Sequence, residues 1–214
     1  MEVGAIYKLF GRRGWGSVLV EAQLAWYGLP FTIEEVDDLF ASAAARARLG
    51  PINPVAQVPT LLLPDGSVMT ESAAISLHLA DVAGSDALVP APGDTLKPRF
   101  LRWLVFLVAN IYPTFTYADD PARFVPGEEG QKGFRANVDA YCQRLWHQVE
   151  AAAGAPWFFG ERFTALDIYI AVMTHWRPRR GWFAQACPGL HAIALRVDAK
   201  PRLAAVWARN FPQG

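Results

Sequence analysis

Cysteine and net charge are the two things that this sequence most clearly lacks. Only Cys142 and Cys187 occur among 214 residues, and their separation fits neither a CxxC motif nor a metal-ligand spacing. We expect no metal site, and two buried thiols in a reducing compartment rather than a disulfide. The 20 Lys and Arg residues match the 20 Asp and Glu residues, so no net positive charge favours nucleic acid or an anionic membrane as a partner.

Long apolar runs are also missing. The apolar segment 100–112 is shorter than the ~20 residues that a membrane-spanning helix needs, and Arg102 interrupts it. The N-terminal segment shows no basic stretch followed by an apolar one, which is the pattern of a signal peptide. We therefore expect a cytoplasmic protein, and its 52% of hydrophobic residues argues against disorder and for a substantial core.

Strand and helix patterns alternate over the first part of the chain. Ser17 is a candidate N-cap and Gly28 a candidate stop for the first helix, and Asp65-Gly66 between two apolar runs is typical of a β-hairpin. The first two strands, joined by a helix, are expected to be parallel, and the last two antiparallel. The order β-α-β-α-β-β-α follows from strands predicted at 4–10, 30–37, 58–64 and 67–71 and helices predicted at 17–28, 42–50 and 72–84.

The composition changes after this α/β segment. Residues 84–93 are rich in Pro, Gly, Ser and Asp, as in a linker, and beyond them only helical patterns are convincing. We therefore predict an N-terminal domain at 1–83 and an all-helical domain at 94–214. The helices are expected within 95–115, ending or kinking near Pro113, and within 131–154, 163–176 and 187–210, with a break near Lys200-Pro201 and loops at 119–130 and 177–183.

A family resemblance rests on four segments: NPVAQVPTLLLPDGSVMTESAAI at 53–75, GLPF at 28–31, FTALDIYIA at 163–171 and RVDAKPRLAAVWAR at 196–209. A βαβαββα unit with X-Pro at the start of its third strand resembles the thioredoxin-like fold. With a helical domain behind it, the whole chain resembles a cytosolic glutathione S-transferase of bacterial type. That resemblance implies glutathione as co-substrate and a homodimer in which each α/β domain contacts the helical domain of the other copy.

The resemblance assigns a glutathione site to the first of these segments. A cis Val58-Pro59 bond would turn the backbone N–H and C=O of Val58 outward, where the cysteinyl part of glutathione pairs with them like an added strand. Ser72, at the start of a helix, would bind the γ-glutamyl carboxylate, Glu71 its ammonium group, and Gln57 the peptide backbone or the glycyl carboxylate. Taken singly, Pro59 would be a trans edge-strand proline, Ser72 an N-cap and Glu71 a first-turn acid.

The group that activates the thiol is harder to assign. Lowering the thiol pKa from about 8.5 to about 6.5 requires roughly 2.7 kcal/mol of extra stabilisation of the thiolate. Members of the family supply a Tyr, Ser or Cys near the end of the first strand, and these positions fall here on or near Phe10, 12–14 and Gly16, which carry neither a hydroxyl nor a thiol. Ser17 is left as the candidate catalytic residue, through its hydroxyl and the N–H groups at the helix start.

Alternatives to a catalytic Ser17 stay open. Its hydroxyl could serve only as an N-cap, and Arg12 and Arg13 could either stabilise the thiolate or be solvated. The glycine-rich turn GWGS could present backbone N–H groups to the anion. Tyr7 lies within the first strand and is expected to be packed rather than catalytic.

In the helical domain, structural roles are preferred over functional ones. Thr164 and Asp167 have the spacing of a capping box, so Asp167 is expected to start a buried helix rather than to act in catalysis. An electrophile pocket is expected between the domains, although aromatic residues at helical spacing more often belong to a core. Its candidate walls are Trp103, Phe106, Tyr112, Phe115, Tyr117, His175 and Trp176.

These features predict a glutathione transferase that attaches the glutathione thiolate to a small hydrophobic electrophile. Two other functions stay open. One is a glutathione-dependent disulfide or peroxide reductase, or an isomerase. The other is a binding or interaction protein that has kept the fold and lost the chemistry, an alternative that the missing Tyr, Ser and Cys support.

Overall fold

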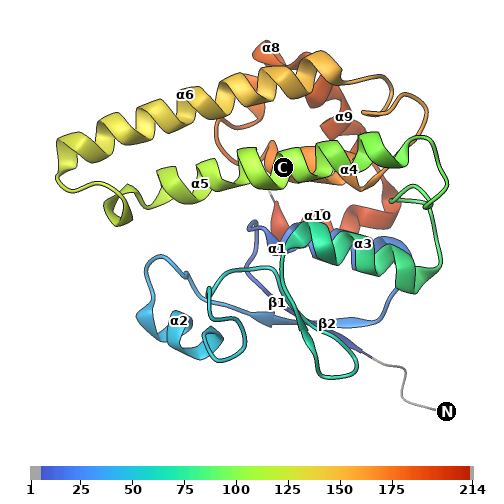
Figure 1. Ribbon diagram of the computed structural model, residues 1–214, viewed down its shortest axis with the longest axis horizontal. Coiled ribbons are helices and arrows are strands. Elements are labelled where there is room, and N and C mark those ends of the chain that lie inside the picture. The colour runs from blue at the N-terminus through green and yellow to red at the C-terminus, as the bar shows by residue number, and fades with distance from the viewer. Residues whose placement is uncertain (1–5, 213–214) are drawn as a thin grey trace. The chain divides into compact units, whose positions relative to one another are not determined.

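The computed structural model of the protein describes residues 6–212, which form two compact units (Figure 1). The first unit contains the described residues up to Val89 together with those from Asp198 onward, and the second is Pro90–Val197. The sequence had suggested one helical domain from residue 94 onward. In the structure the C-terminal segment groups with the α/β unit instead, because its last helix is hydrogen-bonded to the first helix of the chain.

The first unit is built on a mixed four-stranded sheet with the strand order β2-β1-β3-β4. The β1–β2 pair is parallel and the β3–β4 pair antiparallel, which confirms the two predicted pairings, and β1 also pairs with β3 in an antiparallel manner. Residues 4 and 5 of the first predicted strand lie outside the described residues. The strands are β1 (Tyr7–Gly11), β2 (Phe31–Glu35), β3 (Thr60–Leu62) and β4 (Val68–Met69).

Successive side chains of β1 belong to two hydrophobic clusters, one on each face of the sheet. Tyr7 and Leu9 pack with residues of α1 and α3, which lie on the same side of the sheet (Figure 1), so Tyr7 is packed as predicted. Phe10 packs instead with residues of α2. Gly28 ends α1 in a left-handed conformation with φ of 68°. The helices of this unit are α1 (Ser17–Tyr27), α2 (Ala43–Leu49), α3 (Ser72–Ala83) and α10 (Ala204–Asn210).

The second unit is helical, as predicted. A π-helical turn at Leu107–Ile111 interrupts the α-helix just before Pro113, which has no N–H to donate, so the interruption lies where a break or kink was expected. One segment differs: residues 177–183, expected to be a loop, contain the start of α8. The helices are α4 (Lys97–Phe106), α5 (Tyr112–Asp119), α6 (Glu128–Ala152), α7 (Ala165–Met173), α8 (Arg180–Ala186) and α9 (Pro188–Asp198).

A capping box starts α7, the most completely buried helix of this unit. The carboxylate of Asp167 accepts the N–H of Thr164 at 2.8 Å and the N–H of Phe158 at 2.8 Å. Asp167 therefore joins the first turn of α7 to the segment before it. This confirms its predicted structural role.

Both cysteines are buried and free, as predicted. None of the helices in the described part of the chain is long and apolar enough to cross a membrane. Within residues 6–212, no group of three or more His, Cys, Asp or Glu side chains is arranged to hold a metal ion.

Candidate functional site

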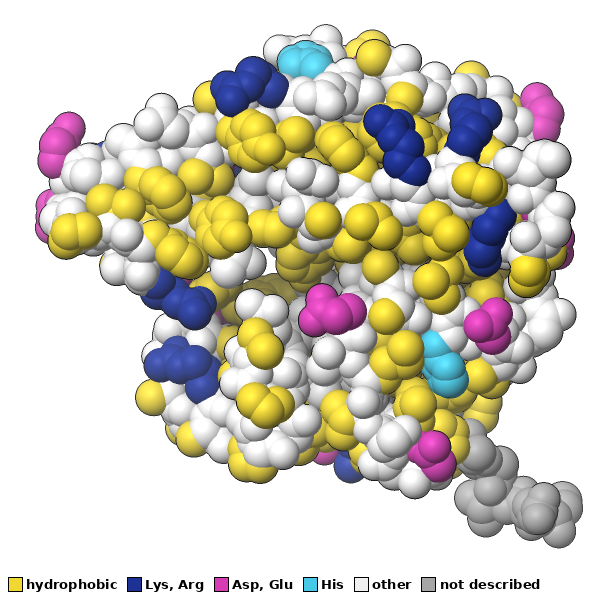
Figure 2. Space-filling model, in the orientation of Figure 1, with side chains coloured by type: hydrophobic (Ala, Val, Ile, Leu, Met, Phe, Trp, Pro, Cys, Tyr) yellow, Lys and Arg dark blue, Asp and Glu magenta, His cyan; other side chains and the backbone are white. Residues whose placement is uncertain are grey.

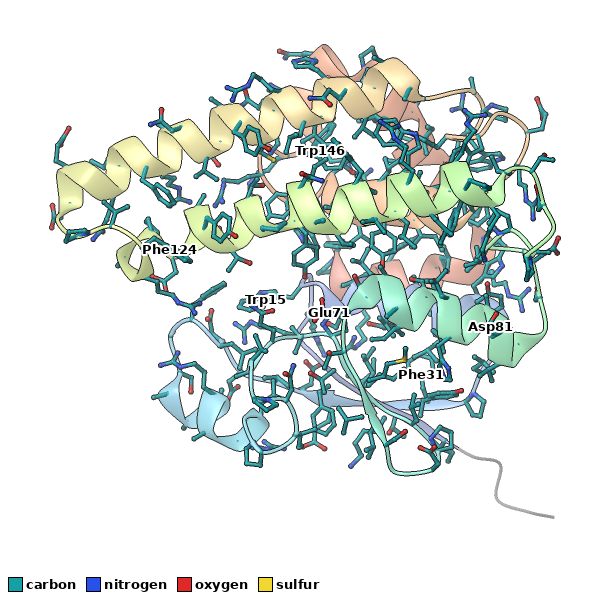
Figure 3. All side chains as sticks on the ribbon, in the orientation of Figure 1. Trp15, Phe31, Glu71, Asp81, Phe124 and Trp146 are labelled. Atoms are coloured by element: carbon teal, nitrogen blue, oxygen red, sulfur yellow. The ribbon has the colours of Figure 1, made fainter. Side chains whose placement is uncertain are left out.

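The end of β1 lies beside the start of β3, and this brings two loops together. Phe10 pairs with Thr60 in the antiparallel register. Phe10 and Val58 share one hydrophobic cluster, and Trp15 packs against it. The loop after β1 and the loop before β3 therefore lie next to each other, and Trp15 marks the first of them in Figure 3.

The loop before β3 presents an unpaired backbone edge at Val58. The Val58–Pro59 peptide bond is cis, as predicted. Among the described residues, neither the N–H nor the C=O of Val58 has a hydrogen-bond partner, whereas its side chain is buried. An unpaired donor and acceptor beside a sheet can bind an extended peptide as an added strand. Gln57 is exposed next to this edge, so its side-chain amide is open to a ligand.

Asn53 fixes the shape of this loop. Its side chain is buried and donates to the C=O of Gln57 at 3.1 Å and to Oγ1 of Thr60 at 2.9 Å. It also accepts the N–H of Val55 at 3.1 Å. Asn53 had no predicted role, and the Asn-Pro pair at 53–54, which is typical of a turn, is the signal that could have identified it.

The start of α3 has the features expected of a carboxylate site. Glu71 occupies the N-cap position with a left-handed φ of 64°, and its exposed side chain makes no capping bond. Ser72 is the first helical residue rather than the N-cap, and its hydroxyl has no partner among residues 6–212. The first-turn N–H groups are therefore not capped by these side chains, and such a helix start favours an anion. Figure 3 labels Glu71 at this position.

Ser17 closes the loop after β1. Its hydroxyl accepts the N–H of Arg12 at 3.1 Å and donates to the C=O of Arg12 at 3.1 Å, and the residue is 2% exposed. Gly16, not Ser17, is the N-cap of α1. The loop itself thus engages the hydroxyl, while the N–H groups of Gly16 and Ser17 have no hydrogen-bond partner in the described part of the chain.

Both arginines of this loop are paired with carboxylates. Arg12 Nη2 lies 3.6 Å from Asp38 Oδ2, and Arg13 Nε lies 3.5 Å from Glu35 Oε1. Exposed ion pairs of this kind are weak. Either guanidinium can therefore leave its partner, but neither is held facing the start of α1.

A buried polar contact joins α1 and α3. Gln23 Nε2 donates to the C=O of Leu19 at 2.9 Å and to Ser76 Oγ at 2.8 Å. Ser76 Oγ in turn donates to the C=O of Ser72 at 2.8 Å. β1 and β4 are both antiparallel to β3 and therefore run in the same direction. Because α1 follows β1 and α3 follows β4, the two helices start at the same edge of the sheet. The free N–H groups at Ser17 and Ser72 therefore belong to one region of the first unit.

Known proteins resemble this chain over nearly its whole length. Residues 20–82 match the family model described as "Glutathione S-transferase, N-terminal domain". The GST-like protein YncG of Escherichia coli (strain K12) is 38% identical over 204 residues, which are 95% of this chain and 98% of that protein. The chain belongs to the glutathione S-transferase family. Its mixed sheet and helical unit form the glutathione S-transferase fold that the sequence predicted.

Two further relatives extend the likeness to other members of the family. Glutathione S-transferase GstA of Escherichia coli O157:H7 is 29% identical over 202 residues, which cover 94% of this chain and 91% of the relative. The solved structure of a sphingomonad glutathione S-transferase complexed with glutathione is 27% identical. It covers 93% of this chain and 96% of its own, with a TM-score of 0.75.

The residues predicted to line an electrophile pocket cluster only in part. Trp176 contacts Tyr112 and Phe115 edge to face, with ring centroids 5.4 Å and 5.1 Å apart. Trp103 is buried, whereas Tyr117 is 42% exposed. The second unit therefore offers an aromatic cluster around Trp176.

Proposed function

We propose that the protein is a glutathione transferase that joins the thiolate of glutathione to a small hydrophobic electrophile. The observation that carries this proposal is the presence, in one unit, of an unpaired backbone edge at Val58 and a free helix start at Ser72. The first suits an extended peptide and the second a carboxylate, and glutathione has both features. Membership of the family supports glutathione as the co-substrate.

Glutathione binds along the loop before β3. Its cysteinyl backbone pairs with the N–H and C=O of Val58 beside Pro59, and the exposed amide of Gln57 reaches the glycyl end. The γ-glutamyl carboxylate meets the N–H groups and hydroxyl of Ser72 at the start of α3. The exposed carboxylate of Glu71 is adjacent and pairs with the γ-glutamyl ammonium group.

The thiolate lies at the start of α1. The N–H groups of Gly16 and Ser17 are free donors there, and the positive end of the helix dipole adds to their effect. Hydrogen bonds to a charged group contribute about 1.5–3 kcal/mol each, so a pair of them supplies the roughly 2.7 kcal/mol that a thiol pKa near 6.5 requires. Ser17 is catalytic in this proposal through its N–H, while its hydroxyl, bonded to Arg12, fixes the loop.

The proposal extends to the second substrate and to assembly. The aromatic cluster around Trp176 supports an aromatic or unsaturated electrophile. Hydrophobic side chains gather over α4 and α5 on the face drawn in Figure 2, and the exposed hydrophobic residues of these two helices include Val105 and Tyr117. An apolar surface of this kind suits the contact of a homodimer. The proposed dimer acts in the cytoplasm, where it serves in detoxification. Sedimentation at several protein concentrations tests whether the dimer forms.

Calorimetric titration with glutathione, combined with ultraviolet absorbance of the thiolate across pH, tests the proposal. S-methylglutathione has no free thiol and so measures the tripeptide site alone. Ser72→Ala should lower the affinity for both ligands by about tenfold, which is the effect of one lost hydrogen bond to a charged group. The matched control is Ser67→Ala in the β3–β4 hairpin, where the hydroxyl bonds to Asp65, and it should change neither affinity. If neither ligand binds the wild-type protein, the glutathione site is refuted.

A glutathione-binding protein without transferase activity is the second candidate. The observation in its favour is the loop after β1, where the hydroxyl of Ser17 is already engaged by Arg12. Binding of glutathione with an ordinary thiol pKa would favour this candidate. Reductase and isomerase activities would use the same glutathione site, and turnover of disulfides, peroxides or isomerisable substrates separates them from conjugation.

A further inference from the structure

The C-terminal helix α10 is hydrogen-bonded to the backbone of the loop after β1. Asn210 is 6% exposed, and its Oδ1 accepts the N–H of Gly14 at 3.1 Å. Its Nδ2 donates to Glu21 Oε2 in α1 at 2.9 Å and to the C=O of Val206 in α10 at 2.9 Å. One buried amide therefore connects α10, α1 and the loop that precedes α1.

Arg209 makes a second connection, from α10 to α1 and to the end of β2. Its Nη1 donates to Glu21 Oε2 at 2.6 Å, and its Nη2 donates to Glu35 Oε1 at 2.5 Å. Glu35 also faces Arg13 of the loop at 3.5 Å. The planar guanidinium bridges two carboxylates that a single ammonium group could not hold in the same way. The loop is thus held mainly by its backbone at Gly14, and the exposed Arg13–Glu35 pair adds little.

The backbone conformation of Gly14 and its closeness to α10 both restrict the path of the loop. Gly14 has a φ of +72°, a left-handed conformation that glycine adopts readily. A Cβ at this position would lie 3.6 Å from the C=O of Asn210, so α10 covers the loop closely. The free N–H groups of Gly16 and Ser17 follow within the same turn. Where they point depends on how the backbone at Gly14 is held.

We propose that α10 is a positioning element of the sulfur site, in which Asn210 and Arg209 orient the loop after β1 so that the N–H groups of Gly16 and Ser17 meet the thiolate. This inference rests on the proposed function. Asn210 and Arg209 touch neither glutathione nor the electrophile in it, and act through the loop.

The charge of Arg209 should lower the pKa of the bound thiol, as the positioning of the loop does. Burial raises the pKa of Glu21, while the bonds from Asn210 and Arg209 lower it. Glu21 lies one turn into α1, and the positively charged Arg209 beside it favours a thiolate at the helix start. The other charged groups around the loop are the pairs Arg12–Asp38 and Arg13–Glu35. Loss of Arg209 should therefore raise the pKa of the bound thiol both by loosening the loop and by removing a positive charge from its surroundings.

The test compares Asn210→Ala and Arg209→Met with the wild-type protein, using glutathione and S-methylglutathione as probes. The pKa of the bound thiol should rise by about one in each variant, which is about tenfold less thiolate at a fixed pH below that pKa. The affinity for S-methylglutathione should stay within about twofold, because the sites at Val58 and Ser72 are untouched. Arg202→Met is the matched control: it removes an arginine of the same terminal segment that lies over Trp26, and it should leave the thiol pKa unchanged.

Each outcome decides one question. If the wild-type protein does not bind glutathione, or binds it with an ordinary thiol pKa, the proposed transferase site fails and the role of α10 fails with it. If the wild-type thiol pKa is lowered and both variants keep it lowered while losing only thermal stability, α10 is merely structural and the inference is overturned. If Asn210→Ala does not fold, Arg209→Met decides, because Met preserves much of the side-chain length and Asn210 still holds Gly14.

Discussion

Replacing Asn53 with alanine tests how the peptide-binding edge is held in place. The buried side chain links three points of the loop before β3. A neutral hydrogen bond contributes about 1 kcal/mol, and a buried group left without its partner costs about 1–3 kcal/mol. We therefore expect Asn53→Ala to lower the free energy of unfolding by about 2–4 kcal/mol, measured by urea denaturation.

Glutathione binding should report the same change, because Val58 lies in the loop that Asn53 shapes. Displacement of the Val58 edge should lower the affinity for glutathione by about tenfold, which corresponds to one hydrogen bond to the ligand. Calorimetry well below the unfolding temperature measures this affinity. The matched control is Asn137→Ala, an exposed asparagine within α6, which should be neutral or slightly stabilising because alanine favours helix. An Asn53→Ala protein as stable as the control, or one that loses stability but keeps full affinity, would refute this account of the loop.

Three further predictions concern the second unit. Glu150 accepts the N–H groups of Gly189 and Leu190 at 2.9 Å each at the start of α9, so Glu150→Gln should lower the free energy of unfolding by about 1–2 kcal/mol; an unchanged urea midpoint would show that the cap is dispensable. Burial raises the pKa of Asp167 to about 6, above its unfolded value, so the stability of wild type relative to Asp167→Asn should be largest below about pH 4 and shrink as the pH rises towards about 6. A difference that grows with pH would mean that the backbone N–H bonds to Asp167 outweigh its burial. Burial raises the pKa of the Cys187 thiol to about 12, and it also raises the pKa of the Cys142 thiol. An aromatic disulfide reagent at neutral pH should therefore label both thiols only after unfolding. Rapid labelling of the folded protein would contradict this.

The α/β unit could be predicted from the sequence because its signals are local. Gly28 stops α1, and the Asp65-Gly66 pair marks the hairpin between β3 and β4. The start of α8 was missed because Pro178 and Gly181 both count as helix breakers. In the structure Pro178 precedes α8 and Gly181 lies in its first turn, and each residue is tolerated at its position.

The candidate site was predicted only as far as neighbouring residues define it. The order of Val58, Pro59, Glu71 and Ser72 along the chain suggested a peptide edge and a helix start, and the structure contains both. The hydroxyl of Ser17 looked available because nothing in the sequence shows that the backbone of Arg12 folds back onto it. Such a contact depends on the tertiary path of the loop rather than on periodicity or spacing.

A sulfur site built from backbone N–H groups depends on distant residues more than one built from a side-chain hydroxyl. Apart from proline, a substitution at Gly16 or Ser17 leaves the backbone N–H in place, so activation of the thiol at such a site would depend on what fixes the path of the chain. Two of the contacts around this loop come from Asn210 and Arg209, nearly two hundred residues further along the chain, beside the local bonds made by the Ser17 hydroxyl. A backbone sulfur site of the kind proposed would need no Tyr, Ser or Cys side chain in the loop, but it would need the loop to be held in one conformation. Glu21 of α1 is buried and hydrogen-bonded to both Asn210 and Arg209. A buried carboxylate costs stability unless it is paired, and under the proposal this pairing also joins α10 to the helix that the loop precedes.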